Sequence, residues 1–276
     1  MTTADSYLME NLEEAFRLEV KTRPEAVREQ ARWCGVSPGL TVLDAGCGPG
    51  KVTAILHEMI GPEGRILGVD YSDERIRHAR DKYGAKPGID FRVHDLRDPM
   101  DDTDRFDLIW VRFVLEYNLT ESAGIIRNLT RCLRPGGSIC LMDLDHNCLN
   151  HYPLPRAVEK ILFELAEQVE RAYGFDPYAG RKLYAYLYDL GYEEIRMDVR
   201  PHHLIYGDIE DTDVFNWIKK AEVISAKAPD VFREYPGGHR GFFDDFMSFL
   251  NDPRRFTYTP LILCRGRKPV GRTGLR

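Results

Sequence analysis

The hydrophobic pattern of the chain is clearest between residues 41 and 143, where short apolar runs alternate with segments of helical periodicity. Near-continuous apolar strands that alternate with helices predict a parallel sheet covered by helices on both faces. The predicted strands are residues 41–44, 65–70, 89–93, 106–111 and 138–143. The predicted helices between them are about residues 51–60, a helix that opens at Ser72-Asp73-Glu74, and about residues 121–133.

The chain on either side of this region is mostly helical. Apolar residues recur every four positions over residues 5–20, which predicts one helix. A capping box at Thr22-Arg23-Pro24-Glu25 predicts the start of a second helix, which ends near Gly35. Beyond residue 146 the pattern predicts helices over 154–173, 179–190 and most of 208–250, and strands over 193–204 and 256–264.

These elements predict one domain of the α/β class: a seven-stranded, mostly parallel sheet with helices on both faces and a helical lid. Ligands of open α/β sheets bind at the carboxyl ends of the strands, where we place the lid. Within residues 1–276 we assign N-terminal helices that form part of the lid (1–35), a ligand-binding core (36–150), helical lid or acceptor regions (151–190 and 206–252) and the last strands (191–205 and 256–266).

The composition is that of a globular protein, with 43% hydrophobic residues, 30% charged residues and a net charge of −6. These values argue against disorder, collagen-like repeats and a disulfide-dense scaffold. The charge is uneven, because residues 251–276 hold seven Lys or Arg and one acid. That segment carries +6 and the rest of the chain −12. An acidic body argues against a broad phosphate-binding surface, so no nucleic-acid partner is expected.

The sequence also bears on compartment and assembly. The N-terminus has no basic residues ahead of an apolar stretch, and no run of about 20 apolar residues occurs, so we expect neither a signal peptide nor a membrane span. The six cysteines form no C-x-x-C pair, which predicts no structural metal site. We expect a reduced, cytoplasmic protein that is a monomer or a homodimer.

The strongest chemical signal is the sequence V-L-D-A-G-C-G-P-G at Val42–Gly50, where the first predicted strand ends. Glycines allow a sharp turn and a close approach of a ligand to the backbone. The dinucleotide fingerprint is G-x-G-x-x-G, whereas here the spacing is G-x-G-x-G, with Asp44 two residues before Gly46. A carboxylate there suits an ammonium or sulfonium ligand better than a pyrophosphate, which argues against an NAD-dependent oxidoreductase.

This loop resembles motif I of the class I S-adenosylmethionine-dependent methyltransferases, and the resemblance extends over about residues 40–145. It implies a Rossmann-like form of the predicted sheet. It implies S-adenosyl-L-methionine as the cofactor and S-adenosyl-L-homocysteine as the product. It also implies that Asp44, Gly46 and Gly48 contact the amino-acid part of the cofactor.

Acidic residues follow the second and third predicted strands. Asp70 ends the second strand, 24 residues beyond Gly46. An ionised carboxylate can accept hydrogen bonds from two ribose hydroxyls there, and Tyr71 can pack on the adenine. In similar methyltransferases an acid after the third strand accepts the exocyclic amine of adenine, and the next backbone N–H meets a ring nitrogen. That pattern maps onto Asp95 and Leu96.

Two arginines are further candidates. In the family, the turn after the fourth strand usually faces the methionine part of the cofactor, which implies contacts from Val111 and Arg112. Arg112 either binds cofactor or substrate, or only forms an ion pair. Arg17, in the first predicted helix, either pairs with the cofactor carboxylate or is solvated. The Val-Leu-Glu-His sequence of many relatives reads Val-Leu-Glu-Tyr here, so Tyr117 stands in place of a histidine.

Polar residues after the fifth strand are the candidates for a role toward the methyl acceptor. His146 is the predicted catalytic residue, because its ordinary pKa near 6.5 suits a general base. A structural hydrogen bond is the alternative. Asp143, Asp145, His146 and His151 also form a pattern that can ligate a divalent metal, although we predict no metal.

Methyl transfer is an in-line displacement, and positioning alone can supply about 7–11 kcal/mol. We predict an S-adenosylmethionine-dependent methyltransferase (EC 2.1.1.-) that acts on an O, N or C nucleophile of a small-molecule acceptor. The chain has neither the Pro-Pro-aromatic run of amino-base DNA methyltransferases nor the Pro-Cys pair of cytosine-C5 enzymes. The alternatives are a methyltransferase acting on RNA or protein, and a cofactor-binding module without catalysis.

Overall fold

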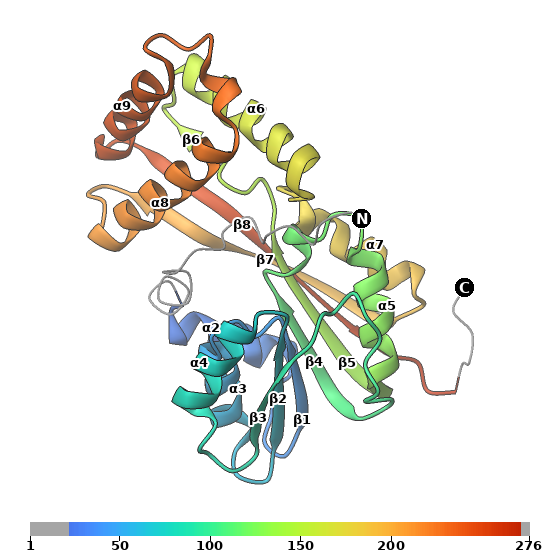
Figure 1. The fold of residues 1–276 in the computed structure, drawn as a ribbon. Helices are drawn as coiled ribbons and strands as arrows, with labels where there is room; N and C mark the ends of the chain where they lie inside the picture. The colour runs from blue at the N-terminus through green and yellow to red at the C-terminus, as the bar shows by residue number, and fades with distance from the viewer. Residues whose placement is uncertain (1–21, 272–276) are drawn as a thin grey trace.

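A computed structural model describes residues 22–271 and has an eight-stranded sheet at its centre (Figure 1). The strand order is β3-β2-β1-β4-β5-β8-β6, and β7 also pairs with β8. The strands are β1 (Thr41–Ala45), β2 (Arg65–Asp70), β3 (Ile89–Val93), β4 (Phe106–Arg112), β5 (Leu133–Leu144), β6 (His151–Tyr152), β7 (Glu193–Tyr206) and β8 (Phe256–Arg267).

The neighbouring strands from β3 to β5 are parallel, and β8 pairs antiparallel with β5, β6 and β7. The predicted α/β class with a mostly parallel sheet is therefore confirmed. The predicted count of seven strands is one too low for the described residues. The added strand is β6, whose two residues are too few to give a strand pattern in the sequence.

Helices cover both faces of the sheet (Figure 1). One face carries α2, α3 and α4, and the other carries α5 and α7. The α-helices are α2 (Pro24–Cys34), α3 (Lys51–Ile60), α4 (Asp73–Tyr83), α5 (Ser122–Cys132), α6 (Arg156–Tyr173), α7 (Leu183–Asp189), α8 (Asp211–Lys227) and α9 (Gly238–Asn251). Short 3-10 turns are η1 (Leu115–Tyr117), η2 (Ala179–Lys182) and η3 (Pro229–Phe232).

Two helices that were assigned to the lid belong to the layers of the core. In α2, Val27, Ala31 and Cys34 are fully buried in the core on one face of the sheet. In α7, Leu183 and Leu187 are fully buried in the core on the other face. Both sets recur at helical spacing, which produces an apolar stripe that must pack against the sheet.

The remaining segments that were assigned to the lid form a helical lobe with a core of its own. β5 pairs with β8 only from Leu261 onward, so residues 256–260 of β8 extend beyond the parallel strands together with the end of β7. α6, α8 and α9 pack around this end of the β7–β8 ribbon (Figure 1). Their core is rich in aromatic side chains, among them Trp217, Phe242 and Phe246.

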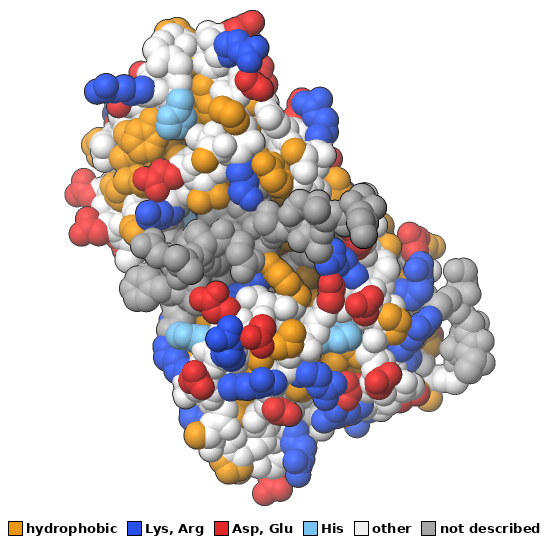
Figure 2. All heavy atoms as spheres, viewed as in Figure 1, with side chains coloured by type: hydrophobic (Ala, Val, Ile, Leu, Met, Phe, Trp, Pro, Cys, Tyr) orange, Lys and Arg blue, Asp and Glu red, His pale blue; other side chains and the backbone are white. Residues whose placement is uncertain are grey.

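The surface differs between the two parts of the molecule. On the face shown in Figure 2, acidic and basic side chains are interspersed over the sheet part, and hydrophobic side chains are more frequent on the helical lobe. All six cysteines lie within the described residues and are free thiols. Within residues 22–271, no helix has the length and apolar character needed to cross a membrane.

A buried arginine ties the elements of the helical lobe together. Arg255 is only 1% exposed. Its Nε donates to the carbonyl oxygen of Leu250 at the end of α9 (2.6 Å), and its Nη2 donates to that of Gly207 after β7 (2.8 Å). Arg255, one of the cations of the basic C-terminal segment, therefore stabilises the core of the helical lobe. Arg254 beside it is exposed and pairs with Asp252 (2.7 Å).

We expect Arg255→Met to lower the free energy of unfolding by about 2–4 kcal/mol, because two carbonyl groups lose their donor. Urea unfolding followed by circular dichroism measures this change. Arg254→Met is the matched control and should unfold near the wild-type midpoint, because its side chain is exposed. Equal midpoints for the two variants would show that Arg255 does not stabilise the lobe.

Candidate active site

A large cavity of about 750 Å³ lies at the carboxyl ends of β1, β2 and β3 and beside the turn that follows β4. Its volume is within the range of small-molecule binding sites, and its place in the sheet is the one expected for ligands of open α/β folds. The structure brings most of the predicted site residues together here. The predicted residues that line it are Gly46, Gly48, Asp70, Tyr71, Asp95, Leu96 and Arg112.

The glycine loop lies against the end of β2. The backbone N–H groups of Gly46 and Cys47 both donate to the carbonyl oxygen of Val69, at 2.8 and 2.9 Å. Gly46 has a φ of 78°, and a Cβ atom there would lie 2.3 Å from Cγ2 of Val114. Both the left-handed backbone and the lack of space require glycine at this position.

Asp70 is buried at the end of β2, and protein groups hold its carboxylate in one orientation. The backbone N–H of Gly48 donates to Oδ2 at 2.9 Å, and the N–H of Ser72 donates to Oδ1 at 3.0 Å. Nε of Arg75 lies 3.3 Å from Oδ1. The carboxylate of Asp70 is therefore held in a fixed orientation at the cavity wall. A carboxylate held in this way can accept hydrogen bonds from the hydroxyl groups of a ligand.

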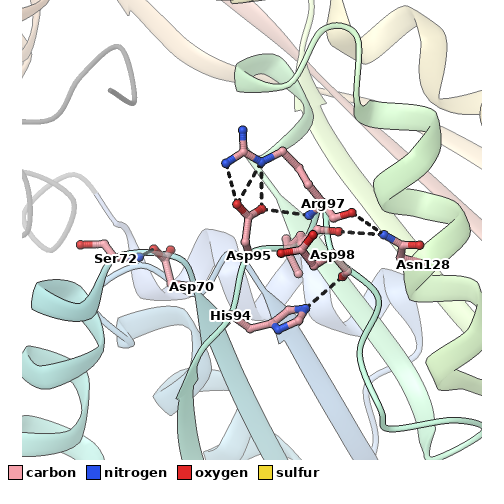
Figure 3. A network of polar contacts seen from close by, with 8 residues as sticks. Asp70, Ser72, His94, Asp95, Arg97, Asp98 and Asn128 are labelled. Atoms are coloured by element: carbon pink, nitrogen blue, oxygen red, sulfur yellow. Dashed lines mark hydrogen bonds and ion pairs between the residues drawn. The ribbon is translucent and has the colours of Figure 1, made fainter. Parts of the chain in front are cut away.

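Asp95 follows β3, the neighbouring strand of the sheet, also lines the cavity, and is paired with Arg97 (Figure 3). Nε of Arg97 lies 3.0 Å from both carboxylate oxygens, and Nη2 lies 2.5 Å from Oδ2. These side-chain hydrogen bonds lower the pKa of Asp95 below its usual range. Since Arg97 also lines the cavity, a ligand that bonds to Asp95 shares the carboxylate with this guanidinium.

The loop that carries Leu96 is fastened to its surroundings. Nδ2 of Asn128, on α5, donates to the carbonyl oxygens of Leu96 (3.3 Å) and Arg97 (2.9 Å). The ring of His94 lies with Nε2 3.1 Å from the carbonyl oxygen of Asp98 (Figure 3). His94 is therefore a hydrogen-bonding part of the loop, and Leu96 is held at the cavity by α5.

Asp44 does not line the large cavity, in contrast to the prediction. It is 2% exposed on β1, and its Oδ2 accepts a hydrogen bond from the Thr53 hydroxyl in the first turn of α3 (2.6 Å). Burial raises the pKa of Asp44 to about 7, although the Thr53 hydrogen bond and the charge of Arg112 act in the opposite direction. The carboxyl group connects β1 to α3 in the core.

The predicted cofactor contacts of Val111 and Arg17 remain to be considered. Val111 is 1% exposed and belongs to the core on the α5 and α7 face, because its side chain points to the opposite face of β4 from that of Arg112. Arg17 lies outside the described residues. The side chain of Val111 therefore cannot contact a ligand in the cavity, whereas the role of Arg17 stays a prediction.

Arg112 is the last residue of β4 and brings a half-buried cation to the large cavity. Its Nε donates to Oε1 of Gln30 on α2 (3.1 Å), and its guanidinium carbon lies 4.0 Å from the ring centre of Phe113. Burial lowers the pKa of Arg112 to about 10, while nearby carboxyl groups raise it. Arg112 therefore stays charged at neutral pH and can bind an anionic group.

The turn η1 forms one wall of the large cavity and is held by Asp143 at the end of β5. Asp143 is completely buried, and its Oδ2 accepts from the backbone N–H groups of Leu115 (2.8 Å) and Glu116 (3.3 Å). Burial raises the pKa of Asp143, and the nearby Glu116 adds to the effect. The anchored turn presents Tyr117 to the cavity.

A second, small cavity of about 90 Å³ adjoins the large one, and Tyr117 lines both. The small cavity is mostly apolar, with walls from α6, α8, α9 and η1. Its polar end is formed by Glu116 and Asn147, whose Nδ2 donates to Oε2 of Glu116 at 2.9 Å. Phe175 packs against Tyr117 with ring centres 5.4 Å apart. Tyr117 therefore lies where the two cavities meet.

His146 lines neither cavity, in contrast to its predicted place beside the reacting group. It has a φ of 49° in the turn after β5, and its ring packs edge-on against Tyr178 with centres 5.1 Å apart. The adjacent Asp145 pairs with Arg181 at 2.7 Å, which in turn lies over the Tyr178 ring. His146 thus belongs to a polar cluster apart from the cavities.

The side chains considered as a metal site are dispersed as well. Asp143 holds η1, Asp145 pairs with Arg181, and His151 lies among the aromatic residues of the helical lobe. Burial lowers the pKa of His151 to about 4. In the part of the chain that the structure describes, no group of three or more His, Cys, Asp or Glu side chains is arranged to hold a metal ion.

Residues 42–137, which contain the glycine loop, Asp70 and Asp95, match the model of a family described as a methyltransferase domain. These residues therefore form a methyltransferase domain of the class I, S-adenosylmethionine-dependent kind. The cofactor of such domains is S-adenosylmethionine, and the residues at the large cavity suit its groups: oriented carboxylates for hydroxyls and an amine, glycines for close approach, and a cation for a carboxylate.

Similar proteins agree with this family. The chain is 33% identical over 141 residues to trans-aconitate 2-methyltransferase from Azoarcus sp. (strain BH72), covering 49% of this chain and 53% of the relative. It is 30% identical over 116 residues to demethylmenaquinone methyltransferase from Lactococcus lactis subsp. lactis, covering 41% and 46%. The chain thus spans about half the length of the curated relatives it matches.

Solved structures share the fold at low sequence identity. Phosphoethanolamine N-methyltransferase 2 from Haemonchus contortus has a TM-score of 0.61 and 13% identity, covering 96% of this chain and 61% of that chain. The [4+2]-cyclase SpnF has a TM-score of 0.54 and 18% identity, covering 90% and 82%. A likeness at this level shows the fold of the chain and leaves its reaction to be argued from the site.

Three cationic residues of the large cavity were not predicted: Lys51, Arg75 and Arg97. Lys51 and Arg75 lie in the first turns of the helices that follow β1 and β2, and such turns meet the carboxyl ends of the strands. The position of Lys51 and Arg75 directly after a predicted strand could therefore have identified them as candidate cavity residues. Tyr117 was noticed only as a departure from the family sequence, and its place between two cavities depends on the helical lobe.

The raised pKa of Asp44 predicts a pH-dependent stability. Between about pH 4 and pH 7 the folded protein binds more protons at Asp44 than the unfolded chain, so this group lowers stability as pH rises through that window. Asp44→Asn removes the ionisation. Relative to wild type, the variant should gain about 2–3 kcal/mol of stability from pH 5 to pH 8, because two units of this range lie below the pKa of about 7. Urea unfolding at both pH values measures this, and parallel pH profiles would contradict the raised pKa.

Proposed function

We propose that the protein transfers a methyl group from S-adenosylmethionine to a small-molecule acceptor. The observation that carries the proposal is the pair of cavities that meet at Tyr117: a large polar one at the strand ends and a small apolar one between η1 and the helical lobe. Methyl transfer needs a cofactor site and an acceptor site that adjoin at one point. A small enclosed pocket suits a small molecule better than a polymer.

The cofactor would be held by both acidic and basic side chains along the large cavity. Asp70 would accept from the ribose hydroxyls, and Asp95 with its neighbour Leu96 would bind the adenine. Gly46 would allow the amino-acid part to approach the backbone, and Arg112 would bind its carboxylate. Each assignment follows the charge and hydrogen-bonding capacity of the side chain.

The bound cofactor supplies a methyl group on a positively charged sulfur. The chain supplies position and a dry environment, because η1 is fixed by Asp143 and the acceptor pocket is walled by apolar side chains. An acceptor that keeps its proton needs a base in this pocket. Glu116 lines the pocket, is 2% exposed, and is oriented by Asn147. We therefore assign the proton-accepting role to Glu116 in place of His146.

The names of similar proteins are consistent with this function. The curated relatives are named for methyl transfer to trans-aconitate and to demethylmenaquinone. The fold neighbour SpnF is named as a [4+2]-cyclase, so turnover has to be measured directly. The test is calorimetry with S-adenosylmethionine and with NAD, followed by a panel of small acceptors. Binding of NAD without S-adenosylmethionine would reject the proposal.

Asp70→Asn should weaken S-adenosylhomocysteine binding at least about tenfold, because a charge-assisted hydrogen bond is worth about 1.5–3 kcal/mol. The amide keeps the shape of the side chain, and its single oxygen can accept from the N–H group of either Gly48 or Ser72, but not from both. Asp73→Asn is the matched control, since Asp73 is exposed on α4 and pairs with Arg77. An unchanged dissociation constant in a folded Asp70→Asn variant would reject the assigned role.

The two candidates for the acceptor side can be separated by one comparison. With an acceptor that keeps its proton, Glu116→Gln should lower kcat at least about 100-fold while the cofactor dissociation constant stays near wild type. His146→Ala should keep kcat within about twofold, because the ring lies outside both cavities. The reverse result, a large loss only in His146→Ala, would restore the histidine to the mechanism.

A further inference from the structure

We infer that the methyl acceptor carries an anionic group, such as a carboxylate, on an apolar body, and that Lys220 and Ser225 of α8 bind its polar groups in the small cavity. This inference rests on the proposed function, because the anion is the methyl acceptor only if the protein transfers a methyl group. The observations are the polarity of one helix face and two groups that lack partners within residues 22–271: an ammonium group with no carboxylate partner and a buried hydroxyl with no hydrogen-bond partner.

The face of α8 that lines the small cavity has the spacing of a helix stripe. It consists of Trp217, Lys220, Ala221, Ile224 and Ser225. Such a stripe is normally apolar throughout, because it packs against neighbouring helices. Here two of its five members are polar and line the cavity. Polar groups in an otherwise apolar wall are costly unless they bind something.

Lys220 brings a positive charge to this wall. Its Nζ lies 3.3 Å from Sγ of Cys148 and 5.1 Å from the ring centre of Trp217. A thiol is a weak hydrogen-bond acceptor and does not neutralise an ammonium group. Across residues 22–271, no carboxylate forms an ion pair with Lys220, although Lys219 beside it pairs with Glu222 at 3.4 Å. The cavity therefore holds a cation whose counter-charge a ligand can provide.

Ser225 is the second polar member of the stripe. It is 5% exposed, and its Oγ has no hydrogen-bond partner among the described residues. Buried hydroxyl groups are almost always hydrogen-bonded in folded proteins. A ligand group in the small cavity, which Ser225 lines, would satisfy this hydroxyl. The unpartnered oxygen is thus an independent sign that the cavity is built for a molecule with polar atoms.

The charges in the small cavity also set the orientation of the acceptor. Glu116 carries the opposite sign to Lys220 and lies at the end where Tyr117 joins the two cavities. An anionic group is repelled by Glu116 and attracted by Lys220. Most of the remaining side chains of the wall are apolar. The anionic group therefore pairs with Lys220 on α8 rather than with Glu116.

The experiment compares phenylacetate with phenylacetamide, which have nearly the same shape and differ in charge. Binding to the full chain, saturated with S-adenosylhomocysteine, is measured by calorimetry. Wild type should bind phenylacetate at least about tenfold more tightly than the amide, as a charge-assisted hydrogen bond implies. Equal affinities, or no binding of either probe at millimolar concentration, would overturn the inference.

Three variants assign the effect to residues. Lys220→Met should reduce the preference for phenylacetate to about onefold, whereas the neighbouring Lys219→Met, whose lysine pairs with Glu222, should keep it. Ser225→Ala should weaken both probes alike, by about fivefold, because it removes a neutral hydrogen bond. A preference that survives in Lys220→Met, or that Lys219→Met abolishes, would contradict the role of Lys220. Thermal melts check that each variant is folded.

The result separates this inference from the proposed function. S-adenosylhomocysteine is titrated into the same samples without a probe, and the probes are also titrated into the protein alone. Tight cofactor binding with equal probe affinities would reject the anionic acceptor and leave the methyltransferase proposal intact. Absence of cofactor binding with a retained carboxylate preference would reject the proposed function and leave an anion-binding cavity at Lys220.

Discussion

The arrangement of the site depends on one buried interaction, the contact between the Asp143 carboxyl group and the backbone of η1. β4 and β5 run in parallel, so the turn after β4 and the end of β5 lie side by side. Asp143 has no access to solvent and takes the N–H groups of Leu115 and Glu116 as donors. A carboxyl group buried at such a cost holds its donors firmly in place. The turn that Asp143 fixes carries Tyr117, which lines both cavities, and Glu116, which lines the smaller cavity.

The division of the molecule into two cores explains how these cavities come to adjoin. The parallel strands and their helices form a sheet-centred core, whereas α6, α8 and α9 form an aromatic core around the outer end of the β7–β8 ribbon. The ribbon belongs to both, so it sets the position of the lobe over the strand ends. Arg255 secures the lobe side of this arrangement. The basic C-terminal segment thus contributes a structural cation rather than a surface charge at this position.

Charge is distributed along the site in a way that fits its proposed ligands. In the large cavity Asp70 and Asp95 are ionic acceptors held by Arg75 and Arg97, and Arg112 is the half-buried cation near η1. In the small cavity Lys220 lies in a mostly apolar wall that also contains Glu116. Pairing of acids with arginines at a cavity wall orients the carboxylates before a ligand arrives, which lowers the entropic cost of binding.

The sequence by itself determined the alternation of strands and helices, the glycine loop, and the gathering of Asp70 and Asp95 at one edge of the sheet. Periodicity and strand ends are local properties, and parallel strands bring their carboxyl ends to the same edge. Only the tertiary structure decided that Asp44 bonds to Thr53 in the core and that Val111 faces away from the cavity. It also placed His146 against Tyr178, and Lys220 and Glu116, 104 positions apart, in one pocket. The direction of a side chain after a turn, and the meeting of distant segments, follow from packing that no local pattern encodes.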